Sequence, residues 1–293
     1  MGTARPRTYD GTMPRSAGVV LAGGRSSRMG SPKAALEWHG STLLWRTVSI
    51  VSRATGGPVV VVRAPGQALP ALPPGTEVVD DPREGQGPVQ GIAAGLAALT
   101  DQADAAFVSS TDMPFLHPAF VRRVIRAIET DGADVGLPVA RGFRQPLAAS
   151  YRTALAAAAE QLVAEGRLKP AFLFERCQVA VLDETALRAD PVLAALDPDL
   201  DSVVNVNEPA DYESARARPG PAVTVQRLGV LANGNRDPRA IRAATVAEAA
   251  EVAGVALGRH VVAALNGDQI TRDGQTPLAT GDAVLFLSAD AGG

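Results

Sequence analysis

The chain has little of what cross-links a small domain or binds zinc. Cys177 is the only cysteine among 293 residues, so no internal disulfide can form and no cysteine cluster can bind zinc. The three histidines are scattered without metal-ligand spacing, and we expect each to lie on the surface or to cap a helix. They are His39, His117 and His260.

Long apolar runs and large blocks of one charge are also missing. No apolar stretch is long enough to cross a membrane, so we expect no membrane partner. The net charge is −3 and no long basic block occurs, which argues against a nucleic-acid partner. Residues 1–16 are polar and lack the apolar centre of a signal peptide, so we expect a disordered lead-in and a cytoplasmic protein.

The chain does contain enough apolar sequence for two cores. Hydrophobic residues make up 46% of the chain, and a length of 293 residues suits two domains. Over residues 17–218 apolar strands alternate with helical patterns, which predicts an α/β domain with a mostly parallel sheet and helices on both sides. Residues 219–221, Pro-Gly-Pro, form a linker. Residues 222–293 contain strand patterns and a single helical pattern, which predicts a small α+β domain.

The most informative stretch ends the first predicted strand. Four apolar residues run into Gly23-Gly24, which indicates a buried strand that breaks into a loop. A glycine loop can turn its N–H groups toward one point and hold an anion, and Arg25, Arg28 and Lys33 add positive charge. The combination predicts a triphosphate site, although the spacing is neither that of a dinucleotide fingerprint nor that of a Walker loop. A basic surface turn is the alternative.

A carboxylate follows a later strand. Asp112 comes shortly after the apolar run 105–109, and ligands of open α/β sheets gather beyond the carboxyl ends of strands. A triphosphate would repel this carboxylate unless a cation lay between them. Mg²⁺ is the expected cation, because it binds one or two carboxylates together with phosphate oxygens. The alternative is that Asp112 caps the helix predicted from Pro118, but Asp112 lies too far upstream of it.

The run from Leu21 to Lys33, L-A-G-G-R-S-S-R-M-G-S-P-K, resembles the signature of the molybdenum cofactor guanylyltransferases, members of the nucleotidyltransferase superfamily. Ser31-Pro32 departs from the family, which usually has an acidic residue there. The Gly-Pro-x-x-Gly run at 87–91 resembles the motif that lies against base and ribose, with a plain helix start as the alternative. The resemblance implies a Rossmann-like fold and a nucleotide site made of Leu21, Ala22, Gly23, Gly24, Arg25, Lys33, Asp81, Gly87, Pro88 and Gly91.

Later motifs resemble the same family. D-M-P-F, beginning at Asp112, matches the motif of the metal-binding aspartate. N-V-N-E-P-A-D, at residues 205–211, resembles the closing motif, although Asp211 can instead stabilise a helix N-terminus. The resemblance implies Arg25, Lys33 and Asp112 as catalytic residues, Asp112 and Asn207 as metal ligands, and Arg144, Gln145 and Asn205 as residues of the second substrate's site.

The C-terminal 70 or so residues resemble a ubiquitin-like, β-grasp sulfur carrier. The most similar kind is the small subunit of molybdopterin synthase, and the thiamine sulfur carrier is a near relative. The matching residues include Leu265-Asn266-Gly267, Gly281-Asp282 and the terminal pair Gly292 and Gly293. The implied partners are an adenylating enzyme of the ubiquitin-activating type and the large subunit of molybdopterin synthase. Glycines suit such a tail, because they have no side chain to block a narrow enzyme channel.

Together the resemblances imply one pathway. The first domain would transfer GMP from GTP to the phosphate of the molybdenum cofactor, and the second would carry sulfur for molybdopterin. The alternatives are a cytidylyltransferase or another small-phosphate nucleotidyltransferase, or a carrier or scaffold whose transferase half is inactive. We also expect the two halves to be independent in their chemistry.

Overall fold

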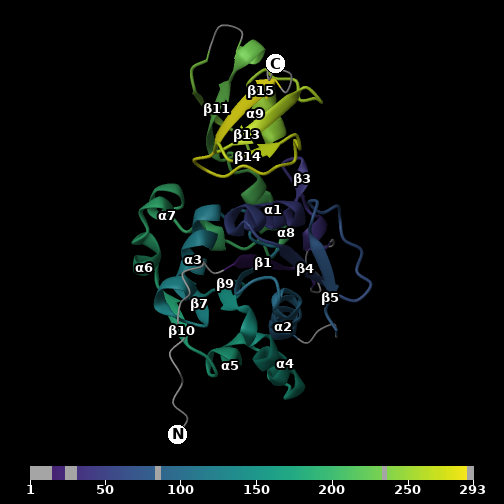
Figure 1. The fold of residues 1–293 in the computed structure, drawn as a ribbon, viewed down its shortest axis with the longest axis vertical. Coiled ribbons are helices and arrows are strands. Elements are labelled where there is room, and N and C mark those ends of the chain that lie inside the picture. The colour runs from purple at the N-terminus through teal and green to yellow at the C-terminus, as the bar shows by residue number, and fades with distance from the viewer. Residues whose placement is uncertain (1–14, 24–31, 83–86, 233–235, 289–293) are drawn as a thin grey trace.

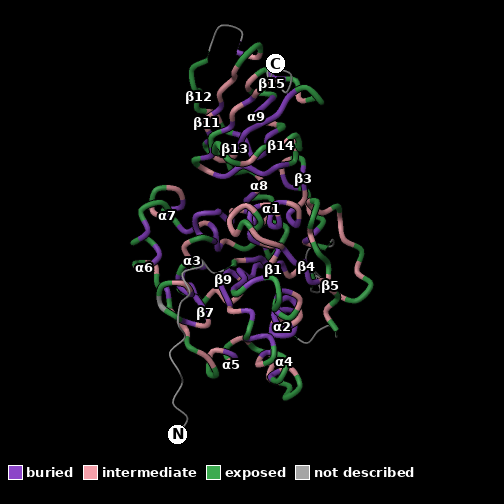
Figure 2. Tube along the Cα trace, in the orientation of Figure 1, coloured by how far each residue is buried: buried purple, intermediate pink, exposed green. Residues whose placement is uncertain are grey.

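The computed structural model describes residues 15–23, 32–82, 87–232 and 236–288, which form two units with separate sheets (Figure 1). The last helix of the first unit ends at Arg216, and the first strand of the second unit begins at Ala222. Buried residues follow the central strands of both units, and exposed residues follow the outer loops (Figure 2).

The first unit is built on a sheet of strand order β10-β7-β9-β6-β1-β4-β5, with β8 paired to β7. Neighbours in the group β6-β1-β4-β5 are parallel, as are β7 and β10, whereas β9 is antiparallel to β6 and β7. The sheet is therefore mostly parallel, which confirms the sequence-based prediction. The strands are β1 (Ser16–Leu21), β4 (Val59–Arg63), β5 (Glu77–Asp80), β6 (Ala105–Ser110), β7 (Val135–Ala140), β8 (Phe143–Arg144), β9 (Ala148–Arg152) and β10 (Val179–Leu182), and a small hairpin is formed by β2 (Glu37–Trp38) and β3 (Ser41–Thr42). The helices are α1 (Leu43–Thr55), α2 (Gly87–Leu99), α3 (Pro118–Asp131), α4 (Ala156–Ala164), α5 (Pro170–Phe174), α6 (Glu184–Arg188), α7 (Pro191–Leu196) and α8 (Pro209–Arg216), with short 3₁₀ turns at Lys33–Ala35, Thr153–Leu155 and Asp201–Val203.

Helices cover both faces of this sheet. Successive residues of a strand point to opposite faces, and β1 shows this directly. Val20 packs in one core with Leu44 of α1 and Phe120 of α3. Val19 packs in the other core with Ile92 of α2. A doubly covered sheet leaves its strand ends as the places where polar side chains can gather.

The helix ends follow the expected capping chemistry. Thr42 accepts a hydrogen bond from the Trp45 N–H at 3.1 Å and begins α1. Gly56 ends α1 in the left-handed conformation at φ 68°. His117 Nδ1 accepts from the Ala119 N–H at 3.0 Å and begins α3, which confirms a capping role for this histidine.

Three stretches differ from the prediction. The acidic sequence of residues 183–202 predicts an irregular segment, but α6 and α7 form there, because Asp183 and Asp190 cap their first turns. The sequence also predicts one strand from Arg144 to Tyr151, but β8 ends at Arg144 and β9 begins at Ala148. The edge strand β12 (Arg239–Arg242) was not expected, because only one of its four residues is even half-buried.

The second unit has a five-stranded mixed sheet of order β12-β11-β15-β13-β14. β11 and β15 are parallel neighbours at its centre, and the other pairs are antiparallel. The pair Asn266-Gly267 predicts a tight turn, and this turn is present, with φ values of 55° and 85°, and joins β13 to β14. The further elements are β11 (Ala222–Arg227), α9 (Val246–Val252), β13 (Val261–Leu265), β14 (Gln269–Thr271), β15 (Ala283–Ser288) and a 3₁₀ turn at Gly229–Ala232.

The units touch along one end of the second sheet. Residues 219–221 are held against the second unit, where Arg242 donates to the Gly220 carbonyl at 2.9 Å. Gly281 has φ +85°, and a Cβ there would lie 2.4 Å from Leu196 Cδ2 of the first unit. β15 starts beside this contact and runs to Ser288 at the opposite end of the unit (Figure 1).

Candidate active site at the carboxyl edge of the first sheet

The parallel strands β1, β4, β6 and β7 end at the same edge of the first sheet, because they run in one direction. The segments that follow them carry most of the predicted site residues. Open α/β sheets bind their ligands beyond this edge.

Three predicted residues meet there through hydrogen bonds. Lys33 Nζ lies 2.9 Å from Asp112 Oδ2 and 2.8 Å from Asn207 Oδ1. The Lys33 and Asp112 side chains are 19% and 17% exposed, so solvent and ligands can reach the pair. The three residues come from segments far apart in the sequence, and the fold brings them to one point as the prediction required.

The backbone fixes the two oxygen donors. The Val206 N–H donates to the Asp112 carbonyl at 2.9 Å, which joins the segment after β6 to the segment before α8. The Asp211 carboxylate accepts from the Asn207 N–H at 3.0 Å and so fixes Asn207 at the start of α8. Asp211 thus stabilises the helix N-terminus, as the alternative interpretation proposed. Ser110, which sequence reasoning missed, donates to Asp112 Oδ1.

The donor set fits a hard divalent cation. Asp112 Oδ2 and Asn207 Oδ1 both lie within 2.9 Å of one positively charged nitrogen, so two oxygen donors already converge on one cation. Mg²⁺ takes oxygen ligands and is often held by one or two protein carboxylates plus phosphate oxygens. Across the described ranges, no three His, Cys, Asp or Glu residues gather as a complete metal cage.

The start of the glycine loop leaves β1 close to the strand beside it. The Ala22 N–H donates to the Val62 carbonyl at 2.8 Å, and the Gln67 amide donates to the Ala22 carbonyl at 3.0 Å. A Cβ at Gly23 would lie 3.3 Å from the Ala64 nitrogen, so the backbones approach closely there. Gly24 and Arg25 lie outside the described residues.

The glycines of the second motif, at residues 87–91, allow neighbouring segments to pack closely against the backbone. Gly87 has φ +71°, and a Cβ there would lie 3.0 Å from the Leu168 carbonyl oxygen. A Cβ at Gly91 would lie 3.2 Å from Leu21 Cδ2, so Gly91 allows α2 to pack closely on the end of β1. Pro88, in the first turn of α2, is half-buried. The Asp81 carboxylate accepts from the Gln90 amide of α2, a partner that the sequence did not reveal.

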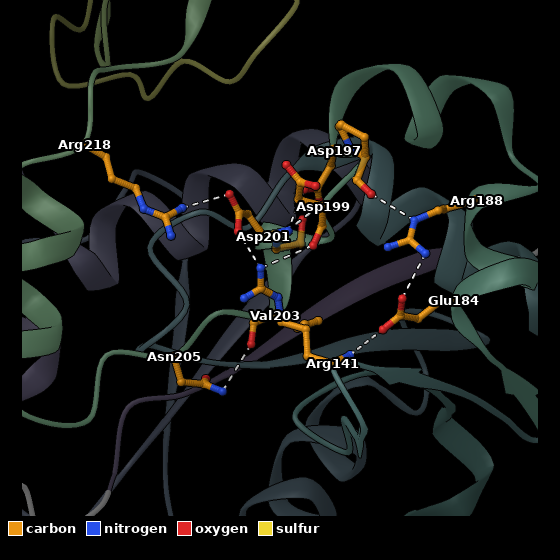
Figure 3. A network of polar contacts seen from close by, with 11 residues as sticks. Arg141, Glu184, Arg188, Asp197, Asp199, Asp201, Val203, Asn205 and Arg218 are labelled. Atoms are coloured by element: carbon orange, nitrogen blue, oxygen red, sulfur yellow. Dashed lines mark hydrogen bonds and ion pairs between the residues drawn. The ribbon is translucent and has the colours of Figure 1, made fainter.

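The residues predicted for the second substrate lie on the same edge but not in one cluster. Arg144 is exposed on β8. The Gln145 amide donates to the Ala140 carbonyl at 3.2 Å and so holds the turn between β7 and β9. The Asn205 amide donates to the Val203 carbonyl at 3.3 Å (Figure 3). Their contact with a substrate stays a prediction.

A charged network that the sequence did not reveal links this edge to the end of the first unit (Figure 3). Arg141, just after β7, pairs with Asp201 at 3.1 Å, and Arg218 pairs with the same carboxylate at 2.8 Å. The Arg218 guanidinium also lies 4.4 Å from the ring centre of Phe115. Burial raises the pKa of Asp197, whose carboxylate accepts the N–H groups of Asp201 and Ser202. The only signal in the sequence is the density of aspartates before Ser202.

Cys177 has no place in this chemistry. Burial raises the pKa of its thiol to about 11, and the thiol donates to the Leu173 carbonyl at 3.2 Å. A thiol with a raised pKa is a poor nucleophile at neutral pH.

A mostly parallel, doubly covered sheet with cationic and carboxylate side chains at its carboxyl edge defines an α/β nucleotide-binding unit. Residues 18–181 match the family model described as MobA-like NTP transferase domain, and the chain belongs to this family. It is therefore a nucleotidyltransferase. The second unit lies outside the matched residues.

Curated relatives support this family. A protein of Mycobacterium avium named "Probable molybdenum cofactor guanylyltransferase" is 35% identical over 206 residues, covering 69% of this chain and 96% of the relative. A protein of the same name from Mycobacterium bovis is 42% identical over 163 residues, covering 54% of this chain and 79% of the relative. The crystal structure of molybdopterin-guanine dinucleotide biosynthesis protein A from Archaeoglobus fulgidus shares the fold, with a TM-score of 0.55 and 24% identity over 69% of this chain and 96% of that one.

Proposed function

We propose that the first unit transfers GMP from GTP to the phosphate of the molybdenum cofactor and releases pyrophosphate. The observation that carries this proposal is the convergence of Lys33, Asp112 and Asn207 at the carboxyl edge of the sheet. The names of the two mycobacterial relatives support the choice of guanylyl transfer and of the acceptor. The proposed location of this activity is the cytoplasm.

The reaction is a displacement at the α-phosphorus of GTP. A phosphate oxygen of the acceptor forms a bond to that phosphorus, and the bond to the bridging oxygen of the β-phosphate breaks, so pyrophosphate leaves. The attacking phosphate is already ionised, so no general base is required. Positioning and charge neutralisation supply most of the catalysis in such reactions. Mg²⁺ held by Asp112 and Asn207 would neutralise charge on the phosphates.

Lys33 has two roles in this proposal. Without nucleotide, its ammonium compensates the Asp112 carboxylate at 2.9 Å. When nucleotide binds, Lys33 exchanges this partner for phosphate oxygens, and Asp112 becomes available to the metal. Arg25 is proposed to bind the triphosphate as well, and Gly87 and Gly91 would border the base.

The test is a nucleotide panel of GTP, CTP and ATP with purified molybdenum cofactor, followed by pyrophosphate release. We expect turnover with GTP to exceed that with either other nucleotide. Equal or faster turnover with CTP would identify a cytidylyltransferase instead. No release with any nucleotide would favour a scaffold with an inactive transferase half. Omission of the cofactor is the control for simple hydrolysis.

For the second unit, the proposed fold is a β-grasp and the proposed role is sulfur carriage. In the order of its own strands, the sheet reads 2-1-5-3-4 with a parallel central pair and one helix on the core side, which supports the β-grasp assignment. β15 leads away from the first unit and ends at Ser288 (Figure 1), and Gly292 and Gly293 lie outside the described residues.

In this role an adenylating partner would transfer AMP from ATP to the Gly293 carboxylate and release pyrophosphate, and a donor of sulfide-level sulfur would displace AMP to leave a thiocarboxylate. With the large subunit of molybdopterin synthase, the sulfur would then pass to the molybdopterin precursor, and the carboxylate would be restored by water. Intact mass after co-expression with an activating enzyme and sulfur donor should show one oxygen replaced by sulfur. A variant lacking Gly292 and Gly293 should show no change in mass. An unchanged mass of the full chain, under conditions that charge a known carrier, would make this unit a structural appendage.

A further inference from the structure

Two arginines of α1 contact the second unit. Arg46 and Arg53 are seven residues apart, so they lie on the same face of the helix two turns apart. Arg46 Nη1 donates to the Leu278 carbonyl at 3.2 Å, and Arg53 Nη1 pairs with Asp282 at 2.8 Å. The Arg46 residue is 7% exposed. The face of α1 that carries these charges is therefore an interface rather than a solvated surface.

Arg46 also reaches the segment that follows the candidate metal ligand. Its Nε donates to the Pro114 carbonyl at 2.5 Å, two residues after Asp112. Arg53 makes no hydrogen bond or ion pair with residues 112–117 in the part of the chain that the structure describes. The two arginines thus share the interface, but Arg46 alone of this pair bonds to the segment after β6.

The bond from Arg46 fixes the position of Pro114. Burial lowers the pKa of Arg46 to about 10, with Arg53 as the next cause, so the guanidinium remains charged at neutral pH. A buried charge requires hydrogen-bond partners, and bonds from charged donors are about twice as strong as neutral ones. The same segment is held again where His117 Nε2 donates to the Thr280 carbonyl at 2.9 Å.

We propose that Arg46 is a positioning residue for Asp112 and that the second unit completes this arrangement through the Leu278 carbonyl. The assignment rests on the proposed function, because Asp112 is taken as a ligand of the metal that accompanies the nucleotide. Arg46 touches no reacting atom and acts through the Pro114 backbone. The two halves would then be coupled, contrary to the expectation that their chemistry is independent.

The test compares Arg46→Gln with Arg53→Gln in the full chain. Both remove an arginine from the interface, but only the first removes the bond to Pro114. The readouts are kcat and KM for GTP, and the affinity for Mn²⁺ measured by electron paramagnetic resonance without turnover. A displacement of about 1 Å at a catalytic group can cost up to a hundredfold in rate, so we expect Arg46→Gln to lower kcat and Mn²⁺ affinity by about tenfold. Arg53→Gln should change each by less than about twofold, because it leaves the bond to Pro114 in place.

A second variant keeps the test decisive if Arg46→Gln does not fold. Arg46→Lys keeps the positive charge but lacks the planar guanidinium that donates at two points. We therefore expect its losses of kcat and Mn²⁺ affinity to be about a third as large as those of Arg46→Gln. Equal losses for the Arg46 and Arg53 variants would assign the effect to docking of the units and overturn the positioning role. Unchanged Mn²⁺ affinity in the Arg46 variants would also overturn it.

Failure of the proposed function has a different signature. An unaltered chain that binds Mn²⁺ but releases no pyrophosphate from GTP would refute guanylyl transfer, while the comparison of metal affinities would still decide the role of Arg46. An unaltered chain without measurable Mn²⁺ affinity would overturn both.

Discussion

The two units use polar side chains at their strand ends in different ways. In the first unit Lys33 bonds to both Asp112 and Asn207 across an edge that solvent can reach. Such side-chain bonds can be exchanged for bonds to a ligand without loss of the fold. This edge is therefore suited to binding and chemistry.

In the second unit the comparable residue holds the structure together. Asp282 accepts from the Ala279 N–H at 2.7 Å and from the Asn266 amide at 2.9 Å, and it pairs with Arg53. Its side chain is 8% exposed, about half the value for Asp112. A carboxylate committed to backbone, turn and interface has no capacity for a ligand. The comparison shows that carboxylates near strand ends differ in role according to their bonding partners. Bonds to exchangeable side chains leave a carboxylate available to a ligand, whereas bonds to the backbone and to another unit do not.

The largest expected effect is on stability, in Asp282→Ala. Removal of one partner of a buried ion pair leaves the other charge uncompensated and costs about 3 kcal/mol or more. Thermal unfolding of the full chain measures the loss. Asp268→Ala, in the neighbouring turn at an exposed position, is the matched control and should be nearly neutral. Equal melting temperatures for Asp282→Ala and Asp268→Ala would contradict the structural role of Asp282.

The next effect is on activity, in Asp112→Asn. Metal-borne charge stabilisation is worth several kcal/mol, so we expect kcat to fall by about a hundredfold or more. Because the carboxylate is accessible and bonds mainly to other side chains, the melting temperature should change little. Steady-state pyrophosphate release at saturating Mg²⁺ measures kcat, and calorimetry measures the melting temperature. A near-normal rate would remove Asp112 from the site.

A smaller effect is expected from Lys33→Ala. The ammonium is a point charge on a flexible stem, so its loss should weaken GTP binding or slow transfer by about tenfold. Lys33→Arg should rescue only part of this, because the planar guanidinium differs in shape and reach. Titration with a fluorescent GTP analogue, together with turnover, separates the two steps. Unchanged binding and turnover in Lys33→Ala would contradict the phosphate-site interpretation.

The smallest effect concerns pH. Burial lowers the pKa of His117, while the Thr280 carbonyl and Asp282 raise it and Arg53 and Arg46 lower it further. A histidine whose pKa is lowered by folding binds its proton first in the unfolded chain. Its contribution to stability is therefore complete above the unfolded pKa of 6.5 and is lost as the pH falls below it.

Protonation of Nδ1 also removes the cap of α3, which costs about 1 kcal/mol. His117→Asn keeps a capping oxygen but cannot titrate, so its melting temperature should depend less on pH between 7 and 5. Calorimetry at both pH values measures the difference. An equal dependence in both proteins would exclude His117 as the titrating group.

Much of the first unit could be predicted because buried strands and their polar ends are local in the sequence. The valines of β4 and the apolar run of β6 predict buried strands, and a parallel sheet then brings the residues after them to one edge. Asp112 follows β6, so its place at this edge could be predicted from the strand pattern. Asn207 follows the 3₁₀ turn Asp201–Val203 rather than a strand, and only the resemblance of its motif to the family predicted it at the site. The partner that they share without ligand, Lys33, was predicted only to bind phosphate.

The remaining features depend on contacts between distant segments. The pattern of α1 predicts which apolar residues face the sheet, but nothing in it shows that Arg46 and Arg53 are covered by another unit. Likewise, Gly91 matches a ligand motif, yet its closest neighbour is Leu21. Helices as short as α6 and α7 have too little periodicity to be distinguished from a loop.

The contact between Leu196 and Gly281 constrains how this fusion can change during evolution or in the laboratory. A Cβ at position 281 would collide with Leu196, and the positive φ there already disfavours other residues. A replacement carrier grafted onto this transferase is therefore expected to keep a residue that tolerates positive φ at the matching turn, and a side chain there requires Leu196 to shift or to be smaller. Relatives that keep both units in one chain should vary at these two positions together, whereas relatives with separate chains are free of the constraint.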